Sequence, residues 1–283
     1  MTAVTVDHAC RLDCVPDHDR PPEVGPLRRA ARRLAFAASC ALAYVLGLVA
    51  AALRPAAARR LMGLWSRSAL RAAGIRVRFD GVGEQPGPTL VVANHVSFFD
   101  GLAMLAAHPH LIGVGTHQSR SNPVLGRLFT RGGVVFVDGT DRAAIPGMVR
   151  DVAAELAAGE SVLVYPEGAP RCREPGGPFR PAVFQAALDA GVPVQPVLTR
   201  CVLRDGTPTA RASWYTGAEE VGSMLDRVFR MRGLELRITL LPPVESANAR
   251  DRRELARTAW HRLVDRTGPL PSDCVTADER ARC

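Results

Sequence analysis

Residues Leu90–Asp100 read LVVANHVSFFD, an apolar run followed directly by an asparagine, a histidine and, five residues after the histidine, an aspartate. The run Leu90–Ala93 predicts a strand, and the apolar spacing from Leu102 predicts a helix. A neutral imidazole can remove a proton from an alcohol, and a carboxylate on its other ring nitrogen fixes the tautomer. We therefore expect His95 to be a general base at a strand end and Asp100 to orient it.

The spacing of this pair is weak evidence without its surroundings. His8 and Asp13 show the same spacing in a polar N-terminal stretch without hydrophobic periodicity. The second pair differs because an apolar run precedes it and Asn94 stands beside it. On this local evidence, the alternative is a buried histidine with a purely structural role.

Three later blocks each join a short apolar strand to a polar turn. They are Gly133–Arg142, Ser161–Gly168 and Ala190–Val197. Helical patterns alternate with strands, and this alternation predicts an α/β domain with a mixed, largely parallel sheet flanked by helices. The expected helices are 102–107, 143–158, 182–190, 217–231 and 251–265, and further strands are expected at 75–79 and 234–241.

The four blocks in this order resemble the lysophosphatidic acid acyltransferase family, over roughly residues 75 to 245. The resemblance implies a glycerolipid-acyltransferase-like fold and transfer of a fatty acyl group from a thioester to a lysophospholipid hydroxyl. The acceptor that it implies is 1-acyl-sn-glycerol-3-phosphate, which gives phosphatidic acid in phospholipid biosynthesis. Acyl-CoA or acyl-carrier protein is the implied co-substrate, and no cofactor or metal is implied.

The resemblance also implies a role for each motif residue. His95 would deprotonate the acceptor hydroxyl as it attacks the thioester, while Asp100 holds the ring. Substrate binding is assigned to Asn94, Arg142, Glu167, Gly168 and Arg171, of which the two arginines would contact an anionic head group. Backbone amides in the turn after Glu167 or near Val194 are candidates for stabilising the oxyanion.

Two departures from the family pattern concern the acceptor more than the chemistry. Gly139 stands where a basic residue usually follows the aspartate, and Ala169-Pro170 replaces the usual threonine and arginine, so that Arg171 comes one place late. The stretch 179–187 also looks like a branch that acylates other lysolipids, such as lyso-ornithine lipid. Alternatives are therefore an acyltransferase for such a lipid or a non-catalytic membrane lipid-binding protein. A lipid hydrolase is less consistent, since the chain has no GxSxG elbow.

Charge and composition limit the partners. The formal net charge is +8 and the pI is about 9.7, which favours an anionic partner, either nucleic acid or a bilayer surface. No nucleic-acid-binding module is recognisable, so we expect no nucleic-acid partner. The seven cysteines are odd in number and scattered, as expected for reduced thiols.

The longest apolar run decides between these partners in favour of a bilayer. Leu34–Leu53 is uncharged and flanked by arginines, and a helix of this length covers about 30 Å. It starts too late for a usual signal peptide. Residues 56–73 follow as an arginine-rich amphipathic pattern with Trp65, typical of a helix in the membrane interface, although a helix packed on the domain is the alternative. Because thioester donors are cytoplasmic, we expect a cell-membrane protein whose catalytic domain is on the cytoplasmic side.

These patterns divide the chain into four parts. A flexible polar tail is expected at 1–26 and membrane-anchoring helices at 27–74. The acyltransferase catalytic domain is expected at 75–245. A C-terminal helix and tail are expected at 246–283.

Overall fold

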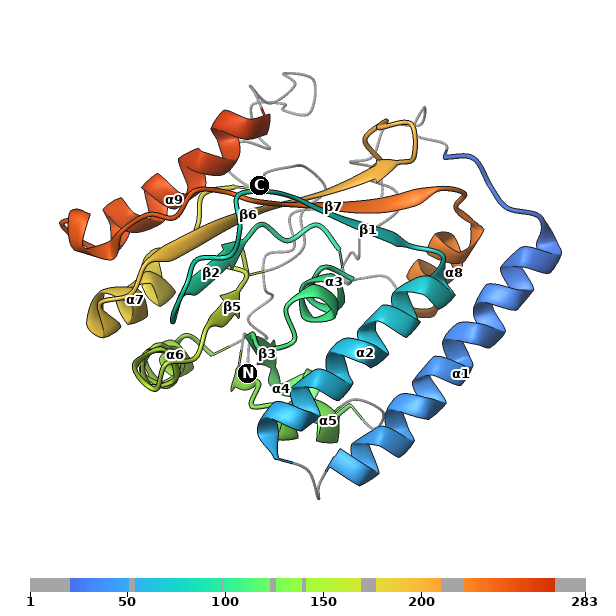
Figure 1. Cartoon of the computed structure of the whole chain (residues 1–283), viewed down its shortest axis with the longest axis horizontal. Coiled ribbons are helices and arrows are strands. Elements are labelled where there is room, and N and C mark those ends of the chain that lie inside the picture. The colour runs from blue at the N-terminus through green and yellow to red at the C-terminus, as the bar shows by residue number, and fades with distance from the viewer. Residues whose placement is uncertain are drawn as a thin grey trace, which may run out of the picture.

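The computed structural model describes residues 21–50, 54–97, 99–122, 126–138, 141–168, 177–209 and 221–267. Within them, one seven-stranded sheet has the order β1-β7-β6-β2-β5-β3-β4 (Figure 1). The strands are β1 (Arg76–Gly81), β2 (Leu90–Ala93), β3 (Ile112–Thr116), β4 (Val135–Val137), β5 (Val162–Val164), β6 (Val194–Leu203) and β7 (Leu234–Leu240). Neighbouring strands are parallel except for β6 and β7, so the predicted mixed, largely parallel sheet is confirmed.

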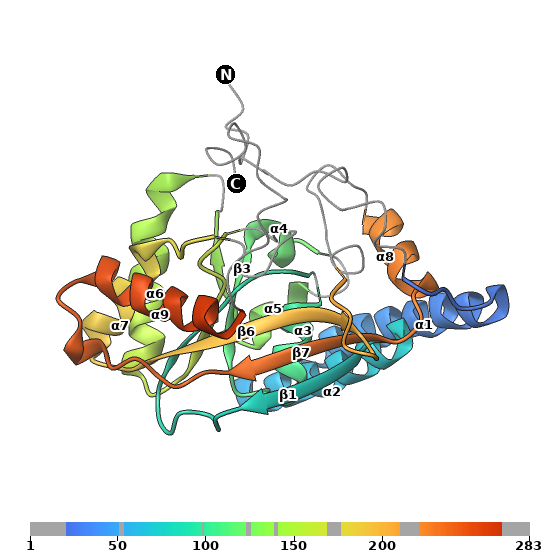
Figure 2. The same ribbon diagram turned by 90° about the horizontal axis from the view of Figure 1, so that it is seen from above.

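Helices cover both faces of this sheet (Figures 1 and 2). They are α1 (Pro26–Ala50), α2 (Pro55–Ala73), α3 (Asp100–Ala107), α4 (His117–Arg120), α5 (Gly126–Arg131), α6 (Ile145–Ala157), α7 (Phe184–Ala190), α8 (Val221–Arg230) and α9 (Arg252–Thr267). The packing around β2 explains its unbroken apolar run. Val91 packs in the core with α2 and α3, whereas Val92 packs in the core with α6, α7 and α9, so both faces of the strand are buried.

Most predicted elements are present with shifted ends. The helix expected at 217–231 is described from Val221 to Arg230, and the strand in the fourth block begins at Val194 and continues to Leu203. The segment β3-α4-α5 was not expected from the sequence. Glycine alternates with apolar residues in β3, which weakens any strand signal, and α4 and α5 are too short for a helical period to show.

The prediction that 56–73 lies with its apolar face in the membrane interface is wrong. In α2, Met62, Trp65 and Leu70 are buried inside the protein, and the Trp65 indole donates a hydrogen bond to the Ser39 carbonyl of α1 (2.8 Å). The reason is that α3 and α1 already cover this face. Helices α1 and α2 therefore pack in one core with the sheet, and α9 packs on the sheet through Leu255 and its neighbours.

Three arginines of helix α1 contact the domain, while a row of its apolar side chains is exposed. Arg29 and Arg33 pair with Asp226 of α8, while Arg32 is buried and donates to the carbonyls of Phe229 and Met231. The exposed large apolar side chains of α1 are Leu27, Leu34, Leu42, Tyr44, Val45 and Leu48. Over Pro26–Leu48 the helix is long and apolar enough to cross a membrane. Of its most apolar stretch of 18 residues, 22% is buried in the protein.

Candidate active site

The first and third sequence blocks meet at the carboxyl edge of the sheet. Strand β2 ends at Ala93 and its parallel neighbour β5 ends at Val164, so the turns that follow them are adjacent. In open α/β sheets, ligands bind outside this edge of the strands. His95 follows β2 and Glu167 follows β5, which brings together residues 72 positions apart in the chain.

His95 and Asp100 form the expected pair. The His95 Nδ1 atom lies 3.1 Å from Asp100 Oδ2, and the carboxylate is fully buried as the first residue of α3. The same oxygen accepts hydrogen bonds from the amides of Val96 (2.8 Å) and Ser97 (2.9 Å). These two amides hold the carboxylate in place at the start of α3. Asp100 is therefore a fixed acceptor for a proton on Nδ1, and the lone pair is left on Nε2.

The backbone and the ring of His95 are held as well. Its amide donates to Glu167 Oε2 (2.9 Å), and its ring stacks on that of Tyr165 with centroids 4.4 Å apart. The side chain keeps 22% of its surface exposed, and Nε2 has no hydrogen-bond partner among the described residues. The imidazole is thus fixed in orientation and open on one side, as a general base must be.

Tyr165 is a site residue that the sequence reasoning missed. Burial, and then the nearby negative charge of Asp100, raise the pKa of its phenol well above the usual value, so the hydroxyl stays neutral. Neither this hydroxyl nor Asp100 Oδ1 has a hydrogen-bond partner within the described ranges, although both are buried. The available signal was its position directly before Pro166 and Glu167.

The Asn94 side chain bonds to strand β6, and its predicted contact with substrate stays a prediction. Its side chain is fully buried, and both of its polar atoms are used by Thr199 of β6. Asn94 Nδ2 donates to the Thr199 carbonyl (2.9 Å), and Asn94 Oδ1 accepts from the Thr199 amide (2.7 Å). These bonds extend the pairing of β2 with β6 beyond the end of β2. Asn94 consequently fixes the direction in which the chain leaves the strand towards His95.

Glu167 and Gly168 of the third block have different neighbours: Glu167 contacts His95, and Gly168 lies beside Arg180. Glu167 is buried and accepts from the His95 amide, so one of its oxygens supports the base. Gly168 has a positive φ of 80°, and a Cβ there would lie 3.0 Å from the Arg180 guanidinium. Arg180 therefore lies over this turn and is a second residue that the sequence reasoning left out of the site.

The two predicted head-group arginines are described only in part. Arg142 begins a short 3-10 helix (Arg142–Ala144) after β4, on the same edge of the sheet as the other blocks. Its assignment to the acceptor stays a prediction. Arg171 and the departures Gly139 and Ala169-Pro170 lie outside the described residues.

Two backbone amides at the positions expected for the oxyanion already have partners. The Gly168 amide donates to the Tyr165 carbonyl (3.0 Å), and the Val194 amide donates to the Val244 carbonyl (2.9 Å). The residues that follow Gly168 lie outside the described ranges, so the expectation for the turn after Glu167 stays a prediction. In the described part of the chain, no group of three histidine, cysteine or carboxylate side chains could hold a metal ion.

Comparisons with known proteins agree on one family. A family model described as Acyltransferase matches residues 75–200. The 1-acyl-sn-glycerol-3-phosphate acyltransferase of Neisseria meningitidis serogroup B is 34% identical over 178 residues, 61% of this chain and 66%, just under two thirds, of that protein. The lyso-ornithine lipid O-acyltransferase of Pseudomonas aeruginosa is 33% identical over 204 residues, 71% of this chain and 76% of that protein.

A solved structure shares the fold. The crystal structure of the 1-acyl-sn-glycerophosphate acyltransferase PlsC from Thermotoga maritima superposes with a TM-score of 0.64 at 16% identity. The match covers 87% of this chain and 99% of that one. At this identity the likeness concerns the arrangement of helices and strands.

Proposed function

Because the chain belongs to the lysophosphatidic acid acyltransferase family, we propose that it transfers a fatty acyl group from a thioester to the hydroxyl of a lysolipid. The observation that carries the proposal is the His95 and Asp100 pair, with Nδ1 engaged and Nε2 open. The foremost acceptor is 1-acyl-sn-glycerol-3-phosphate, and the product is then phosphatidic acid. Either acyl-CoA or acyl-carrier protein supplies the thioester.

The proposed reaction is a single transfer without an acyl-enzyme. The acceptor oxygen attacks the thioester carbonyl carbon while His95 Nε2 takes the hydroxyl proton. As the tetrahedral intermediate collapses, the carbon–sulfur bond breaks and the departing thiolate takes the proton back from the imidazolium. Asp100 stabilises the imidazolium that forms between these steps, 3.1 Å from Nδ1.

Arg180 is our candidate for contact with an anionic head group. Its guanidinium lies over Gly168, next to the residue that holds the His95 amide. Arginine forms forked, charge-assisted hydrogen bonds with phosphate. We expect Arg180→Ala to raise KM for 1-acyl-sn-glycerol-3-phosphate about tenfold with kcat nearly unchanged. Arg150→Ala, at an exposed position of α6, is the matched control, and an equal effect of both substitutions would contradict the assignment.

Lyso-ornithine lipid is the second candidate acceptor. The relatives that bear this name align with about 70% of the chain, more than the phosphatidate-forming relatives do. Its amino-acid head group carries one carboxylate and one amine, so it places a smaller negative charge near Arg180 than a phosphate monoester does. The Arg180→Ala protein should therefore lose less activity towards this acceptor.

Membrane association is proposed from the outward face of α1. A row of exposed apolar side chains runs along the helix, while Arg29, Arg32 and Arg33 are bound to the protein. A helix tied to the domain in this way lies in the bilayer interface more readily than it spans the bilayer, because spanning would strip Arg32 and Ser39 of their contacts. Cytoplasmic thioester donors place the catalytic domain on that side.

The decisive experiment measures acyl transfer from a radiolabelled thioester to a panel of lysolipids. The panel contains 1-acyl-sn-glycerol-3-phosphate and lyso-ornithine lipid, each with acyl-CoA and with acyl-carrier protein. If the unmodified protein transfers the acyl group and the His95→Ala protein does not, the proposal is supported. The lysolipid and the thioester that react identify the acceptor and the donor. Binding of lysolipid without transfer to any acceptor would instead establish the non-catalytic lipid-binding alternative.

A further inference from the structure

A basic cavity of about 460 Å³ lies apart from the acyl-transfer residues. Five arginines from four segments line it. Two come from α1 and one from β1, a fourth directly follows β6, and the fifth lies between α8 and β7: Arg28, Arg32, Arg76, Arg204 and Arg232. The cavity forms because residues 22–24 bridge to 230–232, which includes a bond from the Arg232 amide to the Pro22 carbonyl (2.7 Å). None of the motif residues lines it.

The charges of this cavity are unbalanced. Two carboxylates, Asp205 and Glu235, face the five guanidinium groups, and Glu235 is paired with Arg237 (2.8 Å). In the described part of the chain, Arg28, Arg76, Arg204 and Arg232 form no ion pair. Several unpaired like charges around one hollow repel one another unless an anion lies between them.

Arg32 gives the cavity a rigid wall. Its guanidinium donates to two backbone carbonyls, those of Phe229 (3.1 Å) and Met231 (2.6 Å), and is buried. It packs against Gly74, which ends α2 with a positive φ of 81° and has no room for a Cβ beside the guanidinium. Because the Arg32 side chain is already held in place, little conformational entropy is lost when an anion binds to it.

We propose that this cavity binds the phosphate group of an anionic phospholipid, at a site separate from the catalytic one. Arginine forks suit phosphate oxygens, and Arg28 follows Leu27, which is 87% exposed at the end of the apolar row of α1. A lipid source rests on the interfacial position proposed above for that helix. It places the cavity at the depth of lipid head groups, where clustered arginines attract anionic lipids.

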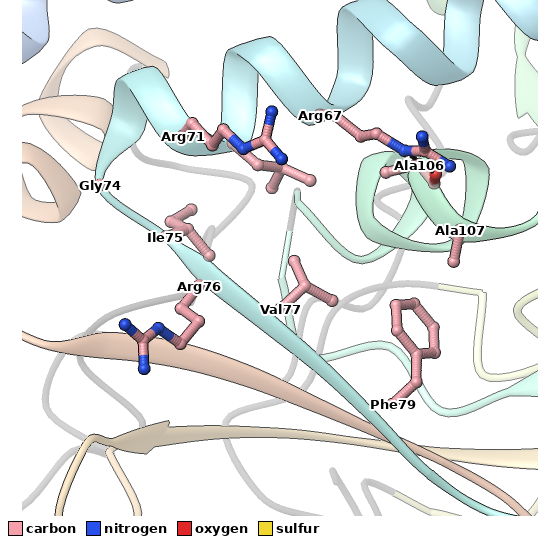
Figure 3. A pocket seen from close by; sticks show the side chains of 10 residues that line it. Arg67, Arg71, Gly74, Ile75, Arg76, Val77, Phe79, Ala106 and Ala107 are labelled. Atoms are coloured by element: carbon pink, nitrogen blue, oxygen red, sulfur yellow. Dashed lines mark hydrogen bonds between the residues drawn. The ribbon is translucent and has the colours of Figure 1, made fainter.

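An adjoining groove supplies apolar surface for the acyl chains. This groove, about 560 Å³, shares Gly74 and Arg76 with the basic cavity. Figure 3 shows Val77 and Phe79 pointing into the space below α2, while Arg76 points away from it on the other side of β1. A free phosphate would make no use of this surface, whereas a phospholipid can bend around the start of the edge strand.

A photoactivatable phosphatidylglycerol, which is neither the proposed acceptor nor its product, tests the site. The protein in neutral detergent is irradiated with the probe, and labelled peptides are identified by mass spectrometry. We expect labels within residues 22–34, 67–79, 203–209 and 221–235, and about tenfold less labelling of Arg204→Ala/Arg232→Ala. The control Arg78→Ala/Arg262→Ala removes the same charge from exposed positions outside the cavity and should leave labelling unchanged.

Competitors distinguish the sources of phosphate. Unlabelled short-chain phosphatidylglycerol should block labelling, whereas inorganic phosphate and CoA at the same concentration should not. If CoA blocks labelling, the cavity belongs to the thioester donor. If the two double variants are labelled equally, the arginines of the cavity do not form a lipid site. Either result overturns the proposal. His95→Ala should label like the unmodified protein, so this outcome is independent of acyl transfer.

Discussion

At the scale of single residues, the proposed chemistry depends on how firmly one imidazole is held. His95 is fixed by three contacts: a carboxylate on Nδ1, a carboxylate on its amide and an aromatic ring against its face. Asp100 in turn is fixed by two backbone amides. This arrangement separates residues that act on substrate from residues that position the base, and the two groups respond differently to substitution.

Asp100→Asn should lower kcat about a thousandfold, because a neutral amide no longer stabilises the imidazolium that forms on His95 during transfer. Since Asp100 acts through His95, the double substitution His95→Ala/Asp100→Asn should be no more damaging than His95→Ala alone. Single-turnover transfer assays on the three proteins measure this. Independent, multiplying losses would mean that Asp100 has a separate role.

Tyr165→Phe should retain activity and should not lower stability, because it removes a buried hydroxyl without a partner and keeps the stacked ring. Tyr165→Leu should lower kcat, since the imidazole loses the ring on which it packs. Transfer rates and chemical denaturation of both variants provide the comparison. If the phenylalanine variant loses as much activity as the leucine variant, the hydroxyl takes part in the site.

At the scale of elements, Asp226 holds α1 to α8. Its carboxylate contacts Arg29 and Arg33 of α1 and Arg230 of its own helix, and these guanidinium groups, Arg29 foremost, hold its pKa well below the usual range. A folded pKa below the unfolded value of about 4 means that the stabilisation is complete above that value and is lost as the pH falls through and below it.

Asp226→Asn should therefore lower the free energy of unfolding by about 1 kcal/mol at neutral pH, because the carboxylate is partly exposed. The difference from the unmodified protein should shrink as the pH falls below about 4. Asp189→Asn is the control and should show little pH-dependent difference, because Asp189 is exposed and, among the described residues, accepts a bond only from Gln185. Denaturant titrations over a pH series measure both, and a constant difference would argue against the ion-pair network.

At the scale of the whole molecule, α1 turns an apolar face outward from a basic protein. The exposed row includes Leu34 at 72% and Val45 at 52%. Each such side chain contributes about 1.5–3 kcal/mol when fully buried in an apolar phase. The arginine-rich cavity near Leu27 gives the same region an attraction for anionic lipids.

Leu34→Glu/Val45→Glu should reduce cosedimentation with phosphatidylglycerol vesicles at least about tenfold, while the protein stays folded because both side chains are exposed. Val82→Glu, at an exposed apolar position after β1, should bind vesicles like the unmodified protein. Thermal unfolding controls for folding. Unchanged vesicle binding by the double variant would place the membrane face elsewhere.

The sequence by itself determined the fold class and the candidate base. Unbroken apolar runs require a sheet covered on both faces, and the pair of His95 and Asp100 is local, since the short connection between β2 and α3 brings both side chains together. Local patterns of this kind are encoded within a dozen residues and need no distant partner.

Only the tertiary structure decided what each side chain faces. Asn94 bonds to Thr199, 105 positions away, and Trp65 bonds to Ser39 of α1, and neither partner can be read from the local sequence. The roles of Tyr165 and Arg180 likewise depend on neighbours from other strands and turns. The physical reason is that polarity and periodicity fix which side chains are buried, whereas the partner in burial is set by the packing of segments far apart in the chain.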